Sequence, residues 1–132
     1  MTCFVDTSAV LILLNRLDPD HKAARKQWEQ LLAAEHDLVT TSYVALESFA
    51  LVQNRLGLDA VRDLHANLMP MVRIHWVNDT LHGAGVGALL SAGKRRLSLV
   101  DCVSFEFMRS RGIRHAFVFD DDFENEGFVC LA

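Results

Sequence analysis

Short apolar runs alternate along this chain with longer segments of helical periodicity, and this alternation restricts the fold more than any other feature. Five of the runs are predicted to be strands, at residues 3–5, 38–40, 72–77, 115–119 and 128–131. Parallel strands need a crossover connection of about a dozen or more residues, which is usually a helix. The sequence therefore predicts an α/β fold with a mostly parallel sheet.

Hydrophobic residues at the spacing of one helix face occupy the segments between the predicted strands. In the first segment they lie at residues 24–32, and Asp18 is expected to cap this helix, with Pro19 at its first position. A second stripe at residues 45–56 precedes another helix, which Asp59 is expected to cap. These stripes predict helices that each bury one side.

The second half of the chain predicts two more long helices. One is expected to begin at Asn78 or Asp79 and to run to about Ser91. The other begins at Ser98 and ends at Gly112, because cationic side chains directly before a glycine are typical of a helix C-terminus. Strands and helices are thus expected to alternate to the end of the chain.

Length and composition are those of one globular domain, expected to occupy residues 1–132. The 13 Lys and Arg residues against 17 Asp and Glu residues give a net charge of −4. Binding to nucleic acid through bulk positive charge is therefore not indicated. Nucleic acid is still compatible with this charge, because carboxylates gathered at a metal site would be neutralised by the ions they hold.

Cysteines and terminal segments indicate the compartment. Cys3, Cys102 and Cys130 form no Cys-x-x-Cys pair, so we expect buried, reduced thiols rather than a zinc site or a disulfide framework. The N-terminus lacks the basic start and long apolar core of a signal peptide. No apolar run approaches the ~20 residues that span a membrane. We therefore expect a soluble, cytoplasmic protein without a membrane partner.

Two aspartates stand where predicted strands end. Asp6 comes directly after the first strand and Asp120 directly after the fourth. In open α/β folds, ligands bind beyond the carboxyl ends of the strands, so both acids are expected in one crevice if these strands are neighbours. For either acid alone, a turn or helix-cap role is an equally good interpretation.

Two further acids lie on predicted helices. Glu47 is flanked at helical spacing by apolar residues such as Val44 and Leu51. A carboxylate buried on such a face needs a cation, a partner or a raised pKa, although an acid at the edge of an apolar stripe is the plainer alternative. Asp101 follows Ser98 at the spacing of a capping box, and the first turn of a helix can also present a carboxylate to a crevice.

Converging carboxylates suit a hard divalent cation, since Mg²⁺ and Mn²⁺ prefer oxygen ligands and Mg²⁺ usually keeps several of its waters. A cation held in this way activates water and neutralises charge on a phosphodiester. No histidine pair at ligand spacing accompanies the acids, so a zinc hydrolase is not indicated.

Four motifs together resemble those of one family. They are Val-Asp-Thr-Ser at residues 5–8, Glu47 after Thr-Thr-Ser, Ser-Leu-Val-Asp at residues 98–101, and Ala-Phe-Val-Phe-Asp-Asp-Asp-Phe at residues 116–123 before Gly127-Phe128. In this order and spacing they resemble the PIN domain, and in particular its VapC-type toxin branch. The resemblance runs from Cys3 to nearly the C-terminus.

The resemblance implies a three-layer α/β/α sandwich around a five-stranded parallel sheet. It also implies a Mg²⁺- or Mn²⁺-dependent endoribonuclease whose metal-activated water attacks the phosphodiester in line, leaving a 5′-phosphate and a 3′-hydroxyl. The metal-binding acids would be Asp6, Glu47, Asp101 and Asp120. Asp122 stands where some members have a further acid and many toxins have histidine, so it is an extra ligand, an outer group or a turn residue.

Other residues and partners follow from the same resemblance. Thr7 and Ser8 would support the metal or the phosphate, with helix capping as the plainer alternative. Four basic residues are expected near RNA, with a solvated surface as an equally good interpretation of each: Lys94, Arg95, Arg96 and Arg114. The VapC-type branch also implies an RNA substrate, a cognate antitoxin that fills the acidic cleft, and a homodimer.

Other functional classes fit these residues less well. A haloacid-dehalogenase-type phosphatase needs Asp-x-Asp after the first strand, where this chain has Ser8 in place of the second acid, and a receiver domain needs paired acids there. The glycines at residues 83–87 have the wrong spacing for a dinucleotide-binding motif and are expected to serve close helix packing. The alternatives kept are a housekeeping PIN-domain RNA-processing nuclease and a PIN-fold module that binds RNA or a partner without cutting.

Overall fold

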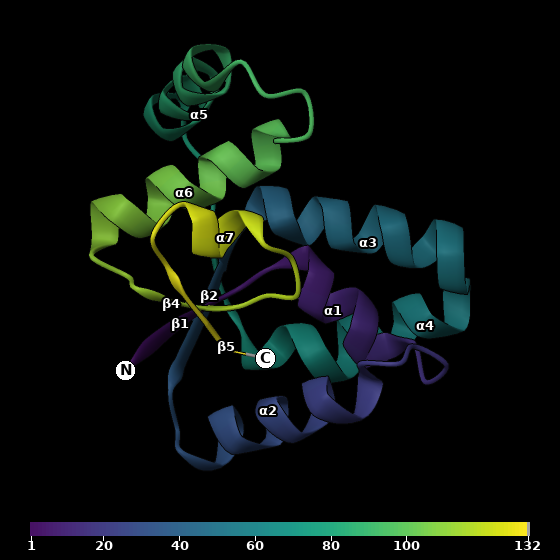
Figure 1. The fold of residues 1–132 in the computed structure, drawn as a ribbon. Helices are drawn as coiled ribbons and strands as arrows, with labels where there is room; N and C mark the ends of the chain where they lie inside the picture. Colours follow the sequence, from purple (N-terminus) through teal and green to yellow (C-terminus); the bar gives the residue numbers. More distant parts are fainter. Residues whose placement is uncertain (132) are drawn as a thin grey trace.

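Five parallel strands form one sheet in the order β3-β2-β1-β4-β5, in a computed structural model that describes residues 1–131 (Figure 1). The elements in chain order are β1 (Thr2–Val5), α1 (Thr7–Leu14), α2 (His21–Ala33), β2 (Asp37–Thr41), α3 (Ser42–Leu56), α4 (Leu58–Asp63), the π-helical η1 (Leu64–Leu68), the 3₁₀-helical η2 (Met69–Met71), β3 (Arg73–His75), α5 (Asp79–Ala92), α6 (Leu99–Arg111), β4 (His115–Phe117), α7 (Asp122–Asn125) and β5 (Val129–Leu131). The parallel sheet and its helical connections confirm the predicted α/β fold.

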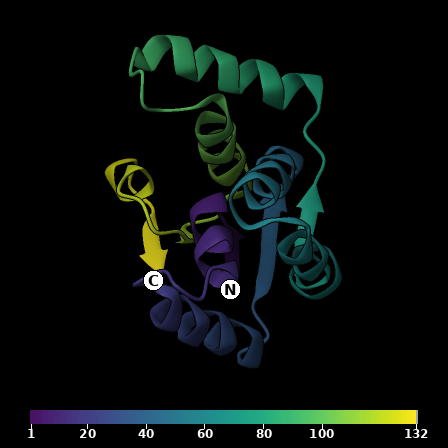
Figure 2. The same ribbon diagram turned by 90° about the vertical axis from the view of Figure 1, so that its right-hand side faces the viewer.

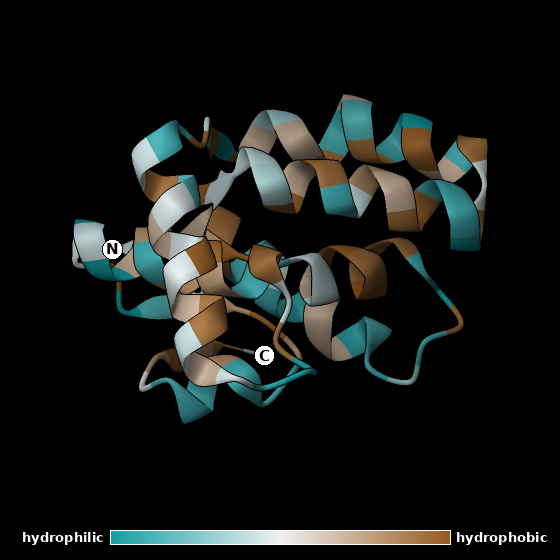
Figure 3. Ribbon diagram, turned by 90° about the horizontal axis from the view of Figure 1, so that it is seen from above, coloured by the Kyte–Doolittle hydropathy of each residue, from teal (hydrophilic) through white to brown (hydrophobic). Residues whose placement is uncertain are grey.

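Successive residues of each strand point to opposite faces of the sheet, so the strands contribute to two separate cores. Phe4 and Val39 pack with Phe107 of α6, whereas Cys3 and Phe117 pack with the helices of the opposite face. Figures 1 and 2 show α6 on one face of the sheet with α5 outside it, and α2 on the other face. Hydrophobic and hydrophilic residues alternate along most of the helices (Figure 3), as expected for helices that bury one side. The predicted three-layer sandwich is confirmed.

The predicted start of the second helix is wrong. The helix α2 begins at His21 with Asp20 at its N-cap, and not at Asp18 with Pro19 in its first turn. The Asp18 carboxylate instead accepts a hydrogen bond from the backbone N–H of Asp20 at 2.8 Å, and its carbonyl oxygen accepts one from His21 at 3.0 Å. These bonds close a turn of the type that aspartate favours, and they delay the helix by two residues.

Asp59 does not cap the helix that contains it. Gly57, with φ at +92°, is both the C-cap of α3 and the N-cap of α4. Glycine adopts this conformation without steric cost, so the chain turns in a single residue and Asp59 falls in the first turn of α4. Its carboxylate there accepts a hydrogen bond from Arg62 at 2.7 Å.

Three strands are shorter than predicted, and β5 is so by one residue, since it spans Val129–Leu131 rather than residues 128–131. β3 spans Arg73–His75 rather than residues 72–77, and β4 spans His115–Phe117 rather than residues 115–119. β4 pairs with β1 only as far as Val5, because the next residues of that chain segment turn into α1. The short helix α7 was not predicted. The end of a strand therefore depends on how far its neighbour extends. The local sequence of the strand does not encode that length.

Several other expectations hold. Cys3 and Cys102 are buried and Cys130 is half-buried, all three as free thiols. Ser98 and Asp101 form the predicted capping box, and Gly112 ends α6 in the left-handed conformation. Among residues 1–131, none of the helices combines the length and the apolar character needed to cross a membrane.

Gly85 provides the close packing expected of the glycine-rich segment. A Cβ atom at this position would lie 2.4 Å from Cγ2 of Val103 and 3.3 Å from the Val103 backbone, so α5 can meet α6 here only through glycine. Val103 is fully buried, and a β-branched side chain in a helix has little rotamer freedom with which to yield. At Gly83 and Gly87 the same added atom would meet nothing within 4 Å.

Gly85→Ala is expected to lower the free energy of unfolding by roughly 1–3 kcal/mol, the usual cost of overpacking. Gly87→Ala is the matched control, because it adds the same atom to the same helix in open space, where alanine is favoured over glycine by up to about 1 kcal/mol. Urea unfolding of both variants gives the comparison. Equal stability of the two variants would show that the α5–α6 contact is not the reason for Gly85.

Candidate metal centre

Asp6 occupies the point where β1 ends and α1 begins. As the N-cap of α1 it accepts hydrogen bonds on Oδ2 from the backbone N–H of Ser8 at 3.1 Å and from the Ser8 hydroxyl at 2.8 Å. Its side chain is only 3% exposed. The capping interpretation and the site interpretation are therefore compatible at this residue, since a buried carboxylate is fixed at the carboxyl edge of the sheet.

The Ser8 hydroxyl also joins the ends of two neighbouring strands. While it donates to Asp6, it accepts a hydrogen bond from the backbone N–H of Phe119 at 2.9 Å. Phe119 directly precedes Asp120, and β1 and β4 are paired. Ser8 thus holds Asp6 beside the segment that carries Asp120.

Thr7 has a different place from Ser8. It is buried, and its hydroxyl oxygen accepts a hydrogen bond from Ser48 of α3 at 3.4 Å. This contact joins α1 to α3 and does not involve a carboxylate. Of the two hydroxyls expected to support the site, only that of Ser8 bonds to one of its acids.

Three aspartates are oriented by backbone N–H groups close to them in the chain. Asp6 accepts from Ser8, Asp101 accepts from Ser98 at 3.2 Å, and Asp120 accepts from Asp122 at 3.0 Å. A hydrogen bond to the charged form of a carboxylate favours that form. The backbone therefore directs these carboxylates and offsets part of the cost of holding them together.

Glu47 reaches the centre from the first half of α3. It is half-buried, with Val44 buried on one side of it and Leu46 and Ala50 exposed on the other. The expected burial of Glu47 among apolar side chains is therefore met on one side only. The charge of Glu47 nevertheless adds to the raised pKa of Asp101.

Burial is the largest cause of the raised pKa values of these aspartates, and repulsion from neighbouring carboxylates is a smaller cause. The pKa of Asp6 is raised to about 7, mainly by burial and also by the charges of Asp120 and Asp101, while the hydrogen bonds from Ser8 act to lower it. Burial also raises the pKa of Asp101, to which the charges of Glu47 and Asp122 add. For Asp120 the pKa is raised by burial, with added repulsion from Asp101 and Asp122.

The acids expected from the sequence are thus brought to one edge of the sheet. Asp6 and Asp120 lie beyond the ends of the paired strands β1 and β4, Asp101 lies at the start of α6, and Glu47 lies in α3. Asp122 is beside them. Burial and neighbouring negative charges raise the pKa values of Asp6, Asp101 and Asp120, so the centre has negative charge in excess. A hard divalent cation with oxygen ligands fits this donor set.

The side-chain positions do not by themselves form a compact metal-binding group. Within residues 1–131, no three of the acidic, histidine or cysteine side chains stand close enough together to hold a metal. Like charges without a cation between them repel, and Glu47, Asp120 and Asp122 are only partly buried.

The basic candidates are divided between the two ends of the sheet. Arg96 lies at the rim of the acids, with its guanidinium 3.7 Å from Oδ1 of Asp122. Lys94 and Arg95 are exposed in the same loop. Arg114 directly precedes β4 and so lies at the amino edge, away from the acids. The pairing of Arg96 with Asp122 had no signal in the sequence, because it joins the loop before α6 to the start of α7, 26 residues further along the chain (122 minus 96).

The sequence and the fold both match known proteins. The family model "PIN domain" matches residues 3–128. The chain is 36% identical over 128 residues to the 23S rRNA-specific endonuclease VapC20 of Mycobacterium tuberculosis, in two strains, covering 96% of this chain and 95% of the relative. The crystal structure of M. tuberculosis VapC20, described as a sarcin-ricin loop cleaving toxin, matches with a TM-score of 0.84 and 32% identity over 98% of this chain and 97% of that one.

Two more distant structures share the fold. VapBC2 from Rickettsia felis, bound to a DNA fragment from its promoter, has a TM-score of 0.73 at 12% identity and covers 98% of this chain and 97% of that one. FitAcB from Neisseria gonorrhoeae has a TM-score of 0.71 at 13% identity, with coverage of 100% and 97%. The full-length match to the family and to VapC20 is decisive: the chain belongs to the PIN-domain family, in its VapC-type branch.

Proposed function

We propose that this chain is a divalent-metal-dependent endoribonuclease and the toxin of a toxin–antitoxin pair. The observation that carries the proposal is the group of mutually repelling carboxylates at the carboxyl edge of the sheet. Such a group has no structural use without a cation, because gathering like charges costs stability. The relative VapC20 is named as an endonuclease specific for 23S rRNA, which supports RNA as the substrate class.

In this proposal the cation is held by Asp6, Glu47, Asp101 and Asp120. A bound Mg²⁺ or Mn²⁺ ion supplies an activated water and neutralises charge on the phosphodiester. Ser8 fixes the orientation of Asp6, and the capping box fixes that of Asp101. Arg96 at the rim provides the positive charge that an approaching phosphate needs beside so many acids.

The partners follow from the same family. The solved neighbours include a VapBC assembly, which supports a cognate antitoxin as the partner of this chain. An inhibitor of this centre would present positive charge to the acids. We further propose a homodimer, as is common in the VapC-type branch, and a cytoplasmic place of action, where the RNA substrate is.

Asp101→Asn is expected to reduce RNA cleavage by at least roughly 100-fold, since even the outer partners of a metal site cost about 10–100-fold. Asparagine keeps an oxygen that can accept the Ser98 N–H, so the capping box and the fold should survive. The measurement is the rate of cleavage of an RNA pool with Mg²⁺ or Mn²⁺, and growth of cells that express the chain alone. Asp121→Asn, an exposed acid of the same region, is the control and should cut normally.

Two outcomes would contradict the proposal in different ways. Cleavage that persists in Asp101→Asn protein would remove that residue from the centre. RNA left intact by the unmodified chain with either metal, together with RNA binding unchanged in Asp6→Asn, would favour a non-cleaving binding module. Growth arrest that depends on the same acids separates a toxin from a housekeeping nuclease.

The metal-free protein is expected to lose stability as pH rises from about 4 to about 7. The folded pKa of Asp6 is raised to about 7 from 3.8, so the folded state holds a proton over this range that the unfolded state has released. Stability is therefore highest below the unfolded pKa and falls as the pH approaches the folded one, by on the order of a few kcal/mol from this group.

Thermal unfolding with a chelator, at several pH values, tests this dependence. Asp6→Asn should flatten the profile, and Mn²⁺ added near neutral pH should raise the melting temperature of the unmodified chain but not that of the variant. Asp121→Asn is again the control. An unmodified chain whose melting temperature is unaffected by Mn²⁺ would contradict the proposed metal centre without any reference to activity.

A further inference from the structure

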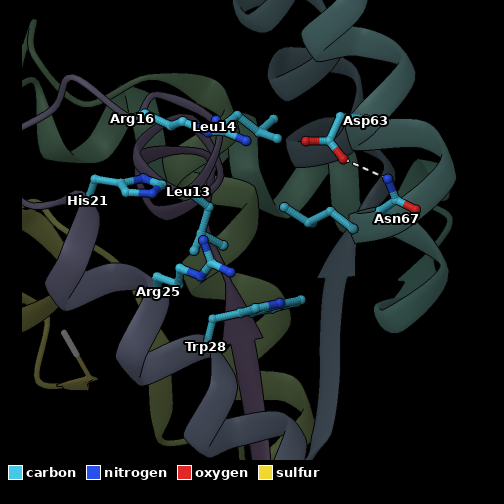
Figure 4. Close-up of a pocket in the computed structure, with 9 residues that line it drawn as sticks. Leu13, Leu14, Arg16, His21, Arg25, Trp28, Asp63 and Asn67 are labelled. Carbon is cyan, nitrogen blue, oxygen red and sulfur yellow. Dashed lines mark hydrogen bonds between the residues drawn. The ribbon is translucent and has the colours of Figure 1, made fainter.

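A cavity of about 310 Å³ lies between the end of α1, the start of α2 and the segment from α4 to η1 (Figure 4). Both polar and apolar side chains line it: Leu13, Leu14, Arg16, His21, Arg25, Trp28, Asp63, Asn67 and Leu68. None of these residues belongs to the acidic centre. The size is that of a small-ligand pocket, in which a few polar groups determine what is bound.

One helix connects this cavity to the acidic centre. Asp6 caps the start of α1 and Leu14 ends it, so about 12 Å separate the two, at ~1.5 Å per helical residue. The wall is fixed, because the His21 ring bonds to the carbonyl oxygen of Ile12 at 2.9 Å and joins α2 to α1. A nucleic-acid strand cut at the acids could reach the cavity with a nearby nucleotide.

Trp28 gives the cavity an aromatic wall. Its ring is stacked on Phe117 of β4, with the centroids 6.1 Å apart and the planes at 21°, so the indole is held in place. Unpaired bases stack on aromatic side chains, and each contact of this kind contributes about 1–3 kcal/mol to binding of single-stranded nucleic acid. An immobile indole is suited to this role because little further ordering is needed.

Two arginines add positive charge beside that wall. Arg25 donates from Nε to Glu29 at 3.1 Å, which leaves the other N–H groups of its guanidinium. Arg16 forms no ion pair within residues 1–131. Figure 4 shows both side chains at the cavity, on the side of α1 and α2. Guanidinium groups bind phosphate through paired hydrogen bonds.

The opposite wall carries an acceptor. Asn67 donates to Oδ1 of Asp63 at 2.7 Å, which fixes the carboxylate, and Figure 4 shows its other oxygen directed across the cavity toward α1. A carboxylate offers several lone pairs and no donor, so it selects a ligand with adjacent N–H groups. Guanine presents two such groups, at N1 and at its amino nitrogen, whereas the other bases place a ring or carbonyl acceptor beside their donor.

We propose that this cavity binds an unpaired guanine of the RNA substrate, at a fixed distance from the cut, with Arg16 and Arg25 contacting the neighbouring phosphates. The inference rests on the proposed RNA cleavage. The combination of aromatic wall, guanidinium groups and inward carboxylate favours a nucleotide over an acidic peptide, which would meet repulsion from Asp63.

Binding can be measured apart from cleavage. Trp76 is 73% exposed and lies outside the cavity, so Trp76→Phe leaves Trp28 as the sole tryptophan. In this background, with a chelator present, 5′-GMP is expected to change the Trp28 emission saturably, and roughly tenfold more tightly than AMP, CMP or UMP. Asp63→Asn should abolish that preference. Asp59→Asn is the matched control, an exposed acid on the same short helix, and should keep it.

The second measurement reads the RNA itself. Sequenced ends of a random RNA pool cut by the unmodified chain should show guanine enriched at one position that is not adjacent to the cut, and Asp63→Asn should lose this enrichment while Asp59→Asn retains it. No response of Trp28 to any nucleotide, or an equal response to all four, would overturn the inference. Displacement by an acidic peptide alone would assign the cavity to a protein ligand. A chain that cuts no RNA but still binds 5′-GMP would contradict the proposed function and not the cavity.

Discussion

The repulsion among carboxylates gathered at one edge of a parallel sheet is the constraint on which the rest of this structure depends. Asp6 is almost completely buried beside other acids, and its pKa of about 7 expresses the cost of charging it there. Without a cation that cost falls on the stability of the folded chain. The two cores on either side of the sheet supply the stability that offsets it, as is usual where proteins keep strained functional sites.

Short-range backbone contacts, rather than side-chain packing, direct the acids. Ser8, Ser98 and Asp122 each provide a backbone N–H to a nearby aspartate, so each carboxylate is oriented by its own turn or cap. Ser8 adds the long-range link, since its hydroxyl also bonds to the end of β4.

Basic side chains lie at separate points around the acidic centre. The chain has a net charge of −4, while Arg96 stands beside Asp122 and Arg16 and Arg25 stand at a cavity about 12 Å along α1. A polyanion is therefore attracted at separate points around an acidic centre rather than by a uniformly basic face. This explains why overall composition gave no indication of nucleic-acid binding.

The sequence alone determined the α/β class, the parallel sheet and the capping box of Ser98 with Asp101, because these depend on periodicity and local caps. The assignment of the four principal acids to a metal site stays a prediction. The ends of helices and strands were harder to predict from the sequence. The start of α2 depended on the turn at Asp18, and the end of β4 depended on where its neighbour β1 ceases to pair. Only the tertiary structure decided that Ser8 rather than Thr7 supports Asp6, that Arg96 meets Asp122, and that Trp28 faces a cavity with Asp63. Those relations join residues far apart in the chain, and the packing of separate elements, not the local pattern, brings them into contact.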